Sequence, residues 1–427
     1  MIDLADLRQR PEAYQTAADK KGIAISIKEF LDLDGRYRET LTAFEQQRAR
    51  QNAFSKEVSS LKGEEKNLKL AEVKELAQRV KELAEEARVV EEEWRAFQLR
   101  IPSIPLDSVP LGRTDAENVL MREVGERPEF HFTPRDHVEL GRMHRLFDIE
   151  RGVQVAGSRS YFLTGNGVRL QHAVMSLAMD LLHRKGYLLM DPPHIVKYDA
   201  MMGTGYLPGD EDAAYRLDDR DPQSYLIGTS EVAVCSFHAG EFLSREELPK
   251  RYAGYSPCYR REAGTYGKDT AGLYRVHQFY KVEQVILCLA DPEESARMHA
   301  ELLGNAEEIL QLLELPYRVV AVCTGDMGKG QVYKNDIESW MPSRKGYGET
   351  HSCSTFYDFQ SRRLGIRYKD SDGKNAYVHT LNNTLVASPR ILIALLENHQ
   401  QEDGSIRVPA ALRPYLGGES VWSVTNG

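Results

Sequence analysis

The clearest pattern of hydrophobic and polar residues in this chain is a repeat between Ser26 and about Arg100. Apolar side chains recur there at alternating steps of three and four, the spacing of a helix that packs along another helix. The first half of the repeat has them at Phe30, Leu33, Tyr37, Phe44, Phe54, Val58 and Leu61. The second half has them at Val73, Leu76, Val80, Leu83, Ala87, Val90, Trp94 and Phe97. Residues 62–67, Lys-Gly-Glu-Glu-Lys-Asn, have turn chemistry, so we expect an antiparallel hairpin of two helices, each roughly 50 Å long.

The same pattern divides the chain into domains. Residues 1–26 are expected to form a short helical lead-in, and the helical arm of residues 27–100 completes an N-terminal domain of residues 1–100. Residues 101–135 begin with Ile-Pro-Ser-Ile-Pro and are expected to form a linker, because proline ends helices. Residues 136–427 form the second domain.

The second domain mixes helical and strand patterns. An amphipathic helix over Leu170–Leu182 stops near Gly186, and the buried strand Tyr187–Met190 follows. Asp291 and Pro292 predict the start of a helix that runs to about Leu315. Further predictions are a strand over 319–322, a surface loop over 208–224 and a helix capped by Ser388 that begins at Pro389.

Residues 252–283 are predicted to be two antiparallel strands joined by a long loop that contains Gly264, Gly267, Lys268, Asp269 and Gly272. Because side chains alternate along a strand, Arg260 and Glu262 are expected on one face of the first strand. Phe279, Lys281 and Glu283 are expected on one face of the second. Such a surface can hold a base, a phosphate and an amino group. The alternative is that these charges form solvated ion pairs on the outside of a hairpin, where they contribute little.

Composition narrows the class of protein. The 427 residues are 41% hydrophobic and 28% charged, ordinary values for a globular protein with two or three domains. No apolar run approaches the length of a membrane span and the first residues lack the apolar core of a signal peptide, so we expect a cytoplasmic protein without a membrane partner. Five cysteines without a Cys-x-x-Cys pair suggest neither disulfides nor a zinc ribbon. A net charge of −9 argues mildly against a protein whose surface is largely covered by nucleic acid, and no DNA partner is expected.

Three further segments carry candidate chemistry. Thr229, Ser230 and Glu231 have oxygens that can accept hydrogen bonds from an α-amino group, although Thr229 or Ser230 can also simply cap a helix. Glu349 and Ser352 provide hard oxygen ligands that suit Mg²⁺ together with phosphate oxygens. The helix that begins near Arg390 points its positive end toward a place that suits a triphosphate, although most capped helices bind nothing.

These motifs, in this order, resemble those of class II aminoacyl-tRNA synthetases. The segments Tyr-Arg-Arg-Glu-Ala-Gly at 259–264, Arg-Val-His-Gln-Phe at 275–279 and Lys-Val-Glu at 281–283 look like the version in seryl-tRNA synthetases. The helix and strand of residues 170–193 match the first class II motif, and Thr380–Arg390 resembles the third. The resemblance covers the chain from the arm to Gly417. It implies an α+β fold in which helices flank an antiparallel sheet, with the coiled-coil arm as a separate domain.

The resemblance also implies roles for individual residues. Arg260 would hold the α-phosphate and the amino-acid carboxylate, Glu262 the adenine amino group, and Phe279 would stack beneath the base. Arg275, with Val276 nearby, would meet the outer phosphates, and Arg390 would close over the adenine and reach the phosphates. The implied serine contacts are Thr229, Ser230, Glu231, Arg260, Glu283 and Thr384, with Glu283 at the substrate hydroxyl. The remaining implied ATP contacts are Arg261, Glu349, Thr350, His351 and Ser352, with Glu349 and Ser352 as the Mg²⁺ ligands. Many seryl enzymes have Asn-Gly-Ser where this chain has Asn382-Asn383-Thr384, and Thr384 keeps the hydroxyl.

The activity implied is formation of seryl-adenylate from serine and Mg-ATP, followed by transfer of serine to tRNA by a homodimer. The arm would grip the tRNA for serine, and the tRNA for selenocysteine is a second candidate partner. Residues 41–70 hold six basic side chains, Arg48, Arg50, Lys56, Lys62, Lys66 and Lys69, against four acidic ones. From periodicity alone, a coiled coil that docks another protein is an equal alternative. Two other functions remain as alternatives: a ligase that delivers the amino acid to another carrier, and a binding protein without activity.

Overall fold

The chain forms two compact units, Ile2–Pro102 and Ser103–Gly427, with Met1 grouped with the second. The computed structural model describes residues 1–60, 62–218, 220, 223–263 and 272–424, without the side chains of residues 60, 64–68 and 71. The expected loop residues Gly264, Gly267, Lys268 and Asp269 lie outside the described residues, as does the side chain of Lys66. No helix within the described ranges combines the length and the apolar character needed to cross a membrane.

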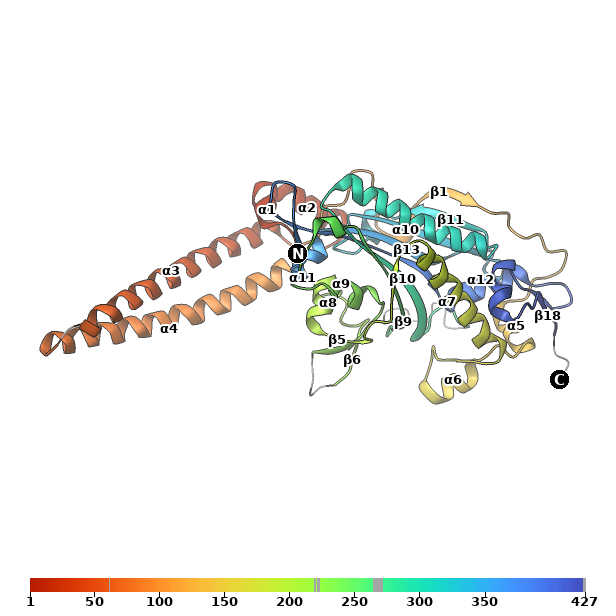
Figure 1. Cartoon of the computed structure of the whole chain (residues 1–427), viewed down its shortest axis with the longest axis horizontal. Coiled ribbons are helices and arrows are strands. Elements are labelled where there is room, and N and C mark those ends of the chain that lie inside the picture. The colour runs from red at the N-terminus through yellow and green to blue at the C-terminus, as the bar shows by residue number, and fades with distance from the viewer. Residues whose placement is uncertain (61, 219, 221–222, 264–271, 425–427) are drawn as a thin grey trace. The chain divides into compact units, whose positions relative to one another are not determined.

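The N-terminal unit is helical. Its helices are α1 (Leu4–Gln9), α2 (Pro11–Lys20), α3 (Ile27–Ser60) and α4 (Glu64–Gln98). The long helices α3 and α4 run side by side, which confirms the predicted hairpin (Figure 1). The turn is shorter than expected because α4 already begins at Glu64, directly after Gly63 at φ 71°. Glutamate and lysine are good helix formers, so Glu-Glu-Lys joins the helix and Gly63 alone supplies the left-handed backbone.

Aromatic rings and one buried carboxylate hold the base of the hairpin together. Trp94 of α4 stacks on Tyr37 of α3, with ring centroids 4.8 Å apart, and lies 6.4 Å from Phe30. The indole nitrogen of Trp94 donates to fully buried Asp34 at 3.1 Å, and Arg8 of α1 donates to both oxygens of that carboxylate. The ionised carboxylate is thus paired as burial requires, and despite desolvation the bonds from Arg8 and Trp94 lower its pKa.

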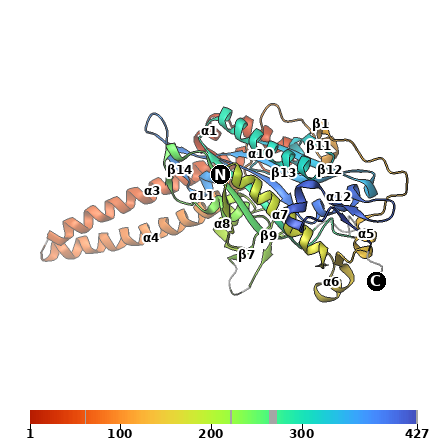
Figure 2. The ribbon, with the colours of Figure 1, turned by 45° about the vertical axis from the view of Figure 1, so that its right-hand side comes forward.

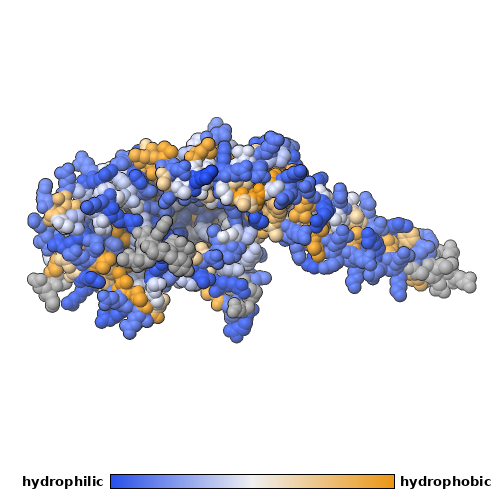
Figure 3. Space-filling model, turned by 180° about the vertical axis from the view of Figure 1, so that it is seen from behind, coloured by the Kyte–Doolittle hydropathy of each residue, from blue (hydrophilic) through white to orange (hydrophobic). Residues whose placement is uncertain are grey.

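The outer half of the hairpin carries the basic residues expected to face nucleic acid. Arg48, Arg50, Lys56 and Lys62 are exposed, and the arm surface seen in Figure 3 is mostly hydrophilic. Lys69 is half-buried, forms an ion pair with Glu57 and lies over the ring of Phe54. Lys69 is therefore already engaged within the hairpin.

The second unit is built on an eight-stranded sheet, in the order β1-β11-β12-β13-β16-β10-β9-β4. Its strands are β1 (Val119–Val124), β11 (Tyr317–Ala321), β12 (Tyr333–Met341), β13 (Gly346–Tyr357), β16 (His379–Ala387), β10 (Gln278–Cys288), β9 (Lys250–Tyr259) and β4 (Leu188–Met190). All neighbours are antiparallel except β4, which runs parallel to β9. The predicted α+β fold with an antiparallel sheet is confirmed. The edge strand β1 lies within the segment expected to be a linker.

Three helices cover one face of this sheet and bury the main core. They are α7 (Asn166–Arg184), α10 (Pro292–Leu312) and α12 (Arg390–His399), and α7 and α10 lie across the strands in Figures 1 and 2. Leu177, Leu302, Ile337 and Leu381 are among the buried residues of this core. As predicted, Asp291 caps α10 and Pro292 is its first residue.

Smaller elements surround this layer. The remaining helices are α5 (His137–Met143), α6 (Ile149–Ala156), α8 (Tyr198–Thr204), α9 (Glu231–Ser236) and α11 (Phe359–Leu364). Two of the short sheets have two strands each: β2 (Phe147–Asp148) with β3 (Phe162–Leu163), and β17 (Ile406–Arg407) with β18 (Val421–Trp422). In a third sheet, β7 (Ser224–Leu226) lies between β5 (Ile195–Lys197) and β6 (Tyr215–Arg216). In a fourth, β14 (Arg367–Lys369) lies between β15 (Asn375–Tyr377) and β8 (Phe242–Leu243). Single 3₁₀ turns are at Asp115–Glu117, Arg245–Glu247, Thr324–Asp326 and Pro342–Arg344, and a longer 3₁₀ segment is at Ala410–Leu416.

Several local predictions were wrong. Ser388 does not cap a helix, because α12 begins at Arg390 and the Ser388 hydroxyl donates instead to Gln171 at 2.8 Å. The segment 208–224 is not only a loop, since it contributes β6 and the start of β7. Strand β9 ends at Tyr259, so Arg260 and Glu262 follow the strand and do not share one of its faces. Glu262 has φ 51°, a turn conformation that strand alternation cannot describe.

Candidate active site

The site is built on the sheet face opposite the covering helices. On β10, alternation places Phe279, Lys281 and Glu283 on this face, as predicted. Lys281 and Glu283 form an ion pair, and their side chains are only 5% and 3% exposed. A solvated pair on an outer face, the alternative from the sequence, is therefore wrong for these two residues. A buried ion pair needs further hydrogen bonds to be tolerated, and Thr384 of β16 supplies one to Glu283 at 3.2 Å.

Arg260 lies on the same face. Its guanidinium carbon is 5.3 Å from the centre of the Phe279 ring, and its Nε donates to the carbonyl of Gly228 at 3.2 Å. Tyr206 lies in the segment after α8, and burial is the main reason that its pKa is raised. The charges of Arg260 and Glu283 also act on this pKa, so Tyr206 lies near both. The guanidinium and the Glu283 carboxylate thus face one common region.

Glu231, at the first turn of α9, is a second buried carboxylate in this region. Its oxygens accept hydrogen bonds from Gln360 at 2.7 Å and from the Tyr206 hydroxyl at 3.3 Å. Burial, and after it the negative charge of Glu283, raise the pKa of Glu231 to about 7. A carboxylate in this state strongly favours a cationic ligand.

The residues just before Glu231 serve the backbone. Ser230 is fully buried and its hydroxyl donates to the carbonyl of Gly254 at 3.2 Å. Gly254 faces Glu283 across β9 and β10, and a Cβ there would lie 2.6 Å from the Ser230 hydroxyl oxygen. Glycine is therefore required for α9 to approach the sheet so closely. Ser230 is the N-cap of α9, but its side chain makes no capping bond, and Thr229 is also buried.

Arg390, at the start of α12, is bound to β13 and to the segment that leads into β10. It donates to the carbonyl of Glu349 at 2.8 Å and to its carboxylate at 3.3 Å, and it lies 4.5 Å from the centre of the Tyr274 ring. Desolvation opposes ionisation of Glu349, but Arg390, Lys334 and Arg260 attract its charge, and its pKa is lowered. Glu349 is consequently an ionised carboxylate near both arginines.

A bulge in β13 sets the directions of the next side chains. The pairing with β12 shifts between His351 and Glu349, so Thr350 is an extra residue. A bulge of this kind returns Ser352 to the face of Glu349, although the two are three residues apart. Thr350 and His351 are buried toward the helices, where His351 bonds to Thr350 at 2.8 Å and to the Leu385 carbonyl at 3.0 Å. The structure thus does not bring these two side chains, implied as ATP contacts, to the site face.

The other implied nucleotide contacts surround Arg260. Glu262 forms an ion pair with Arg275 at 3.2 Å, and Val276 is buried against Phe279 and Cys258. Arg261 is exposed and its backbone N–H donates to the carbonyl of Ala213 at 3.0 Å. These predicted residues therefore meet where β9 ends and β10 begins, in the segment after β9 and the segment before β10.

Comparison with known proteins agrees with this arrangement. Residues 1–105 match the model of the seryl-tRNA synthetase N-terminal domain, and residues 215–399 match the tRNA synthetase class II core domain (G, H, P, S and T). The chain is 45% identical to the serine–tRNA ligase of Deinococcus radiodurans, over 99% of both chains. The chain belongs to the seryl-tRNA synthetase family. Its match to the serine–tRNA ligase of Thermobifida fusca is also 45% identical, over 98% of both chains. The crystal structure of seryl-tRNA synthetase from Pyrococcus horikoshii complexed with ATP superposes with a TM-score of 0.89 at 37% identity, covering 100% of both chains.

The residues of this family member also fit the magnesium ion that the sequence suggested. Glu349 is ionised, 47% exposed and on the same face as Ser352. Within the described ranges, no group of three or more histidine, cysteine or acidic side chains is arranged to hold a metal alone. One ionised carboxylate and one hydroxyl on a common face suit Mg²⁺, which takes one or two protein oxygens and completes its shell with phosphate and water.

Several residues of the site were not predicted from the sequence. Tyr206 lies in the glycine-rich segment of residues 203–209, and neither Tyr206 nor Gln360 stood in a motif that indicated a site. Lys334 and Asp336 pair at 3.1 Å on the same sheet face, and Lys334 acts on the charge of Glu349. The alternation of Lys334, Asp336 and Glu338 was a usable signal, because charges at every second position indicate one polar strand face.

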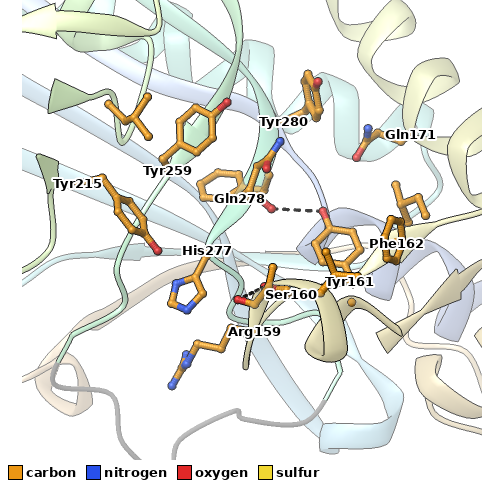
Figure 4. A pocket seen from close by; sticks show the side chains of 16 residues that line it. Arg159, Ser160, Tyr161, Phe162, Gln171, Tyr215, Tyr259, His277, Gln278 and Tyr280 are labelled. Carbon is orange, nitrogen blue, oxygen red and sulfur yellow. Dashed lines mark hydrogen bonds between the residues drawn. The ribbon is translucent and has the colours of Figure 1, made fainter. Parts of the chain in front are cut away.

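A separate cavity of about 560 Å³ lies beside the hairpin of β9 and β10 (Figure 4). Tyr161, Tyr215, Tyr259 and Tyr280 line it, and the Tyr161 hydroxyl donates to the carbonyl of Gln278 at 3.4 Å. Of the predicted site residues, only Phe279 belongs to its lining. The cavity therefore does not coincide with the region between Arg260, Glu283 and Glu349.

Proposed function

We propose that this chain joins serine to tRNA in two steps. In the first, serine and ATP form seryl-adenylate and pyrophosphate. In the second, a hydroxyl of the terminal ribose of the tRNA for serine takes the seryl group, the bond from the seryl carbonyl to the phosphate oxygen breaks, and AMP leaves. The observation that carries the proposal is the common sheet face, where Arg260 and Arg390 lie near a pocket with two buried carboxylates, Glu231 and Glu283.

Each residue has a defined task in the first step. A carboxylate oxygen of serine forms a bond to the α-phosphorus, and the bond from that phosphorus to the oxygen of the β-phosphate breaks. Arg260 holds the carboxylate and the α-phosphate together, which converts an encounter of two anions into a positioned reaction. Arg390 and Arg275 hold the outer phosphates that leave as pyrophosphate, while Phe279 and Glu262 receive the adenine.

The pocket explains the choice of amino acid. Glu283 accepts the hydrogen bond of the substrate hydroxyl and Glu231 receives the α-ammonium group. Alanine would leave the buried Glu283 without the substrate hydroxyl as a donor, which is costly, and in this proposal a tight wall beside the buried Thr384 excludes the extra methyl group of threonine.

Glu349 and Ser352 are the proposed ligands of Mg²⁺ bound with ATP. The ion supplies charge neutralisation for the phosphate oxygens. Arg390 holds the Glu349 carboxylate at 3.3 Å, so the same arginine orients a metal ligand and the phosphates.

The helical arm is the proposed tRNA-binding element, within an N-terminal domain of residues 1–100. Arg48, Arg50, Lys56 and Lys62 are exposed on its outer half and can contact phosphates. The cytoplasm, where tRNA is charged, is the proposed compartment. The tRNA for selenocysteine is a second candidate substrate for the same charging assay.

A homodimer is the proposed working unit. Strand β4 is an edge of the main sheet, and its Leu188 and Leu189 are 58% and 39% exposed. An exposed apolar edge strand is a template for association with another chain. Sedimentation equilibrium should give twice the 48.5 kDa mass of the chain, and Leu188→Asp should lower it toward one chain.

The function is tested by pyrophosphate exchange with each amino acid, followed by charging of total tRNA. We expect exchange with serine and charging of serine tRNA. Exchange without charging would indicate a ligase with another carrier, and silence in both assays would indicate a binding protein. Replacing Arg48, Arg50, Lys56 and Lys62 by alanine should reduce charging and leave exchange intact. A matched control removes four exposed basic residues of α4 nearer its C-terminal end, Lys74, Arg79, Lys81 and Arg88.

A further inference from the structure

Two buried carboxylates share the pocket but have different partners. Glu283 is paired with a cation, Lys281, and accepts a hydroxyl hydrogen bond from Thr384. Glu231 instead accepts from the amide of Gln360 and from the Tyr206 hydroxyl. Among the described residues, no lysine or arginine forms an ion pair with Glu231. The difference in partners suggests that the two carboxylates do different work.

Gln360 is held so that only one end of its amide can face Glu231. It is fully buried in α11, and its oxygen accepts from the Thr380 hydroxyl at 2.6 Å. Its nitrogen then donates to Glu231 at 2.7 Å and to the Thr204 carbonyl at 3.1 Å. Thr380, Thr204 and Glu231 belong to β16, α8 and α9, so Gln360 ties three elements to the orientation of one carboxylate.

Lys281 is buried as deeply as its partner. It shares a face of β10 with Glu283, two residues away, and the opposing residue on β9, Ser256, is fully buried. A buried ammonium and carboxylate at this position compensate each other. Glu231 remains as the second negative charge, within reach of a further cation.

We propose that Lys281 and Gln360 are positioning residues that assign these carboxylates to different groups of the substrate. Lys281, with Thr384, holds Glu283 as an ionised and immobile acceptor for the substrate hydroxyl. Gln360 holds Glu231 toward the α-ammonium group. The inference rests on the proposed function, because it assumes that serine occupies the pocket.

The arrangement makes serine binding dependent on pH through Glu231. The titratable and charged groups that face Glu231 are Glu283 and Lys281 on β10, Tyr206 after α8 and Cys235 on α9, and Arg260 after β9 lies near Tyr206. Burial and Glu283 raise the pKa of Glu231 to about 7, while Gln360 and Lys281 lower it. Loss of the Gln360 amide should raise this pKa further, so that Glu231 needs a higher pH to bind an ammonium group.

The test uses the full-length chain with Lys281→Met, Lys281→Arg and Gln360→Met in serine-dependent pyrophosphate exchange. Lys281→Met should lower the serine-to-alanine ratio of kcat/KM by about 10-fold or more, because Glu283 loses its fixed position. The KM for ATP should change by less than about threefold, since the nucleotide contacts are separate. Lys281→Arg keeps the charge and should restore most of the discrimination. For Gln360→Met, the KM for serine relative to the unsubstituted chain should rise more at pH 6.5 than at pH 8.5.

Two matched variants control for the loss of a lysine and of a buried amide. Lys250→Met removes a lysine at the first residue of β9, away from Ser256, which lies opposite Lys281. Lys250 pairs there with Glu247 at 2.8 Å. Gln284→Met removes a fully buried amide from the opposite face of β10, where Gln284 bonds to Asn305 at 2.8 Å. Both should leave the serine-to-alanine ratio and the pH dependence of serine KM unchanged.

Three outcomes would overturn the inference. They are equal rises in the KM for serine and ATP, a ratio that Lys281→Met leaves unchanged, and a pH dependence that Gln360→Met does not alter. If Lys281→Met does not fold, Lys281→Arg and Gln360→Met carry the test, since a loss of discrimination in the charge-preserving variant would also contradict it. An unsubstituted chain that shows no serine-dependent exchange would overturn the proposed function itself, which distinguishes the two failures.

Discussion

The two faces of the central sheet are built from the same strands but differ in role: one packs against helices, and the other carries the candidate active site. On the face covered by α10, His299 is 5% exposed and bonds to Thr355 at 2.8 Å and to Asn335 at 2.9 Å. On the other face, Lys281, Glu283, Lys334 and Asp336 form ion pairs within reach of the proposed ligands. Around His299 the covered face holds neutral polar groups that satisfy one another, whereas these four residues place charges close together on the site face. Substitutions should therefore change stability on one face and activity on the other.

The largest expected effect belongs to the site face. Arg260→Ala should lower kcat/KM for serine-dependent exchange by about 10³-fold or more, because a charge that holds both reacting groups is lost. Within the described residues, its side chain lies over the Phe279 ring and donates to a backbone carbonyl, so the melting temperature should change little. Exchange kinetics and thermal melting measure the two quantities. A large drop in melting temperature with near-normal exchange would contradict the contrast between the faces.

The covered face should respond in the opposite way. Ile337 is fully buried in the core beneath the covering helices, and Ile337→Ala should lower the free energy of unfolding by about 2–5 kcal/mol. Serine-dependent exchange by the folded fraction should stay within about threefold, since the side chain points away from the site. Urea unfolding and exchange on the same preparation provide the measurement. A selective rise in the KM for serine would show that the two faces are coupled.

Glu283→Ala should separate the choice of amino acid from the reaction itself within the site face. Removing the carboxylate should reduce the preference for serine over alanine by about 10²-fold, because the buried acceptor that alanine would leave without a hydroxyl donor disappears. The ratio of activation rates for the two amino acids is the readout, with Lys250→Met as a control. An unchanged ratio would remove Glu283 from the role of hydroxyl acceptor.

The smallest expected effect is a pH dependence of stability from the covered face. Burial lowers the pKa of His299 to about 4, below its ordinary value of 6.5. The unfolded chain therefore binds a proton first as the pH falls below about 6.5, and stability is lost between about pH 6.5 and 4. His299→Gln should remove about 2 kcal/mol of the stability lost between pH 7 and pH 5. Unfolding free energies at both pH values test this, and exposed His131→Gln should leave the loss unchanged.

Local patterns predicted the arm and the single elements well. The helical hairpin of α3 and α4, the hairpin of β9 and β10 and the Asp291 cap were all confirmed, because each depends on residues near one another in sequence. The wrong predictions also concerned single residues or short segments, but contacts with residues remote in sequence made them wrong. Ser388 was expected to cap a helix, yet Gln171, more than two hundred residues away, takes its hydroxyl.

The sequence by itself determined the family, the helical arm and the order of the charged motifs, because periodicity and motif spacing are properties of neighbouring residues. Only the tertiary structure decided which charges meet. The bulge at Thr350 placed Glu349 and Ser352 on one face, and α11 brought Gln360 to Glu231 across 129 positions of the chain. Burial and pairing in such a pocket depend on distances between strands and helices remote in sequence, and these distances are set by packing of the whole core.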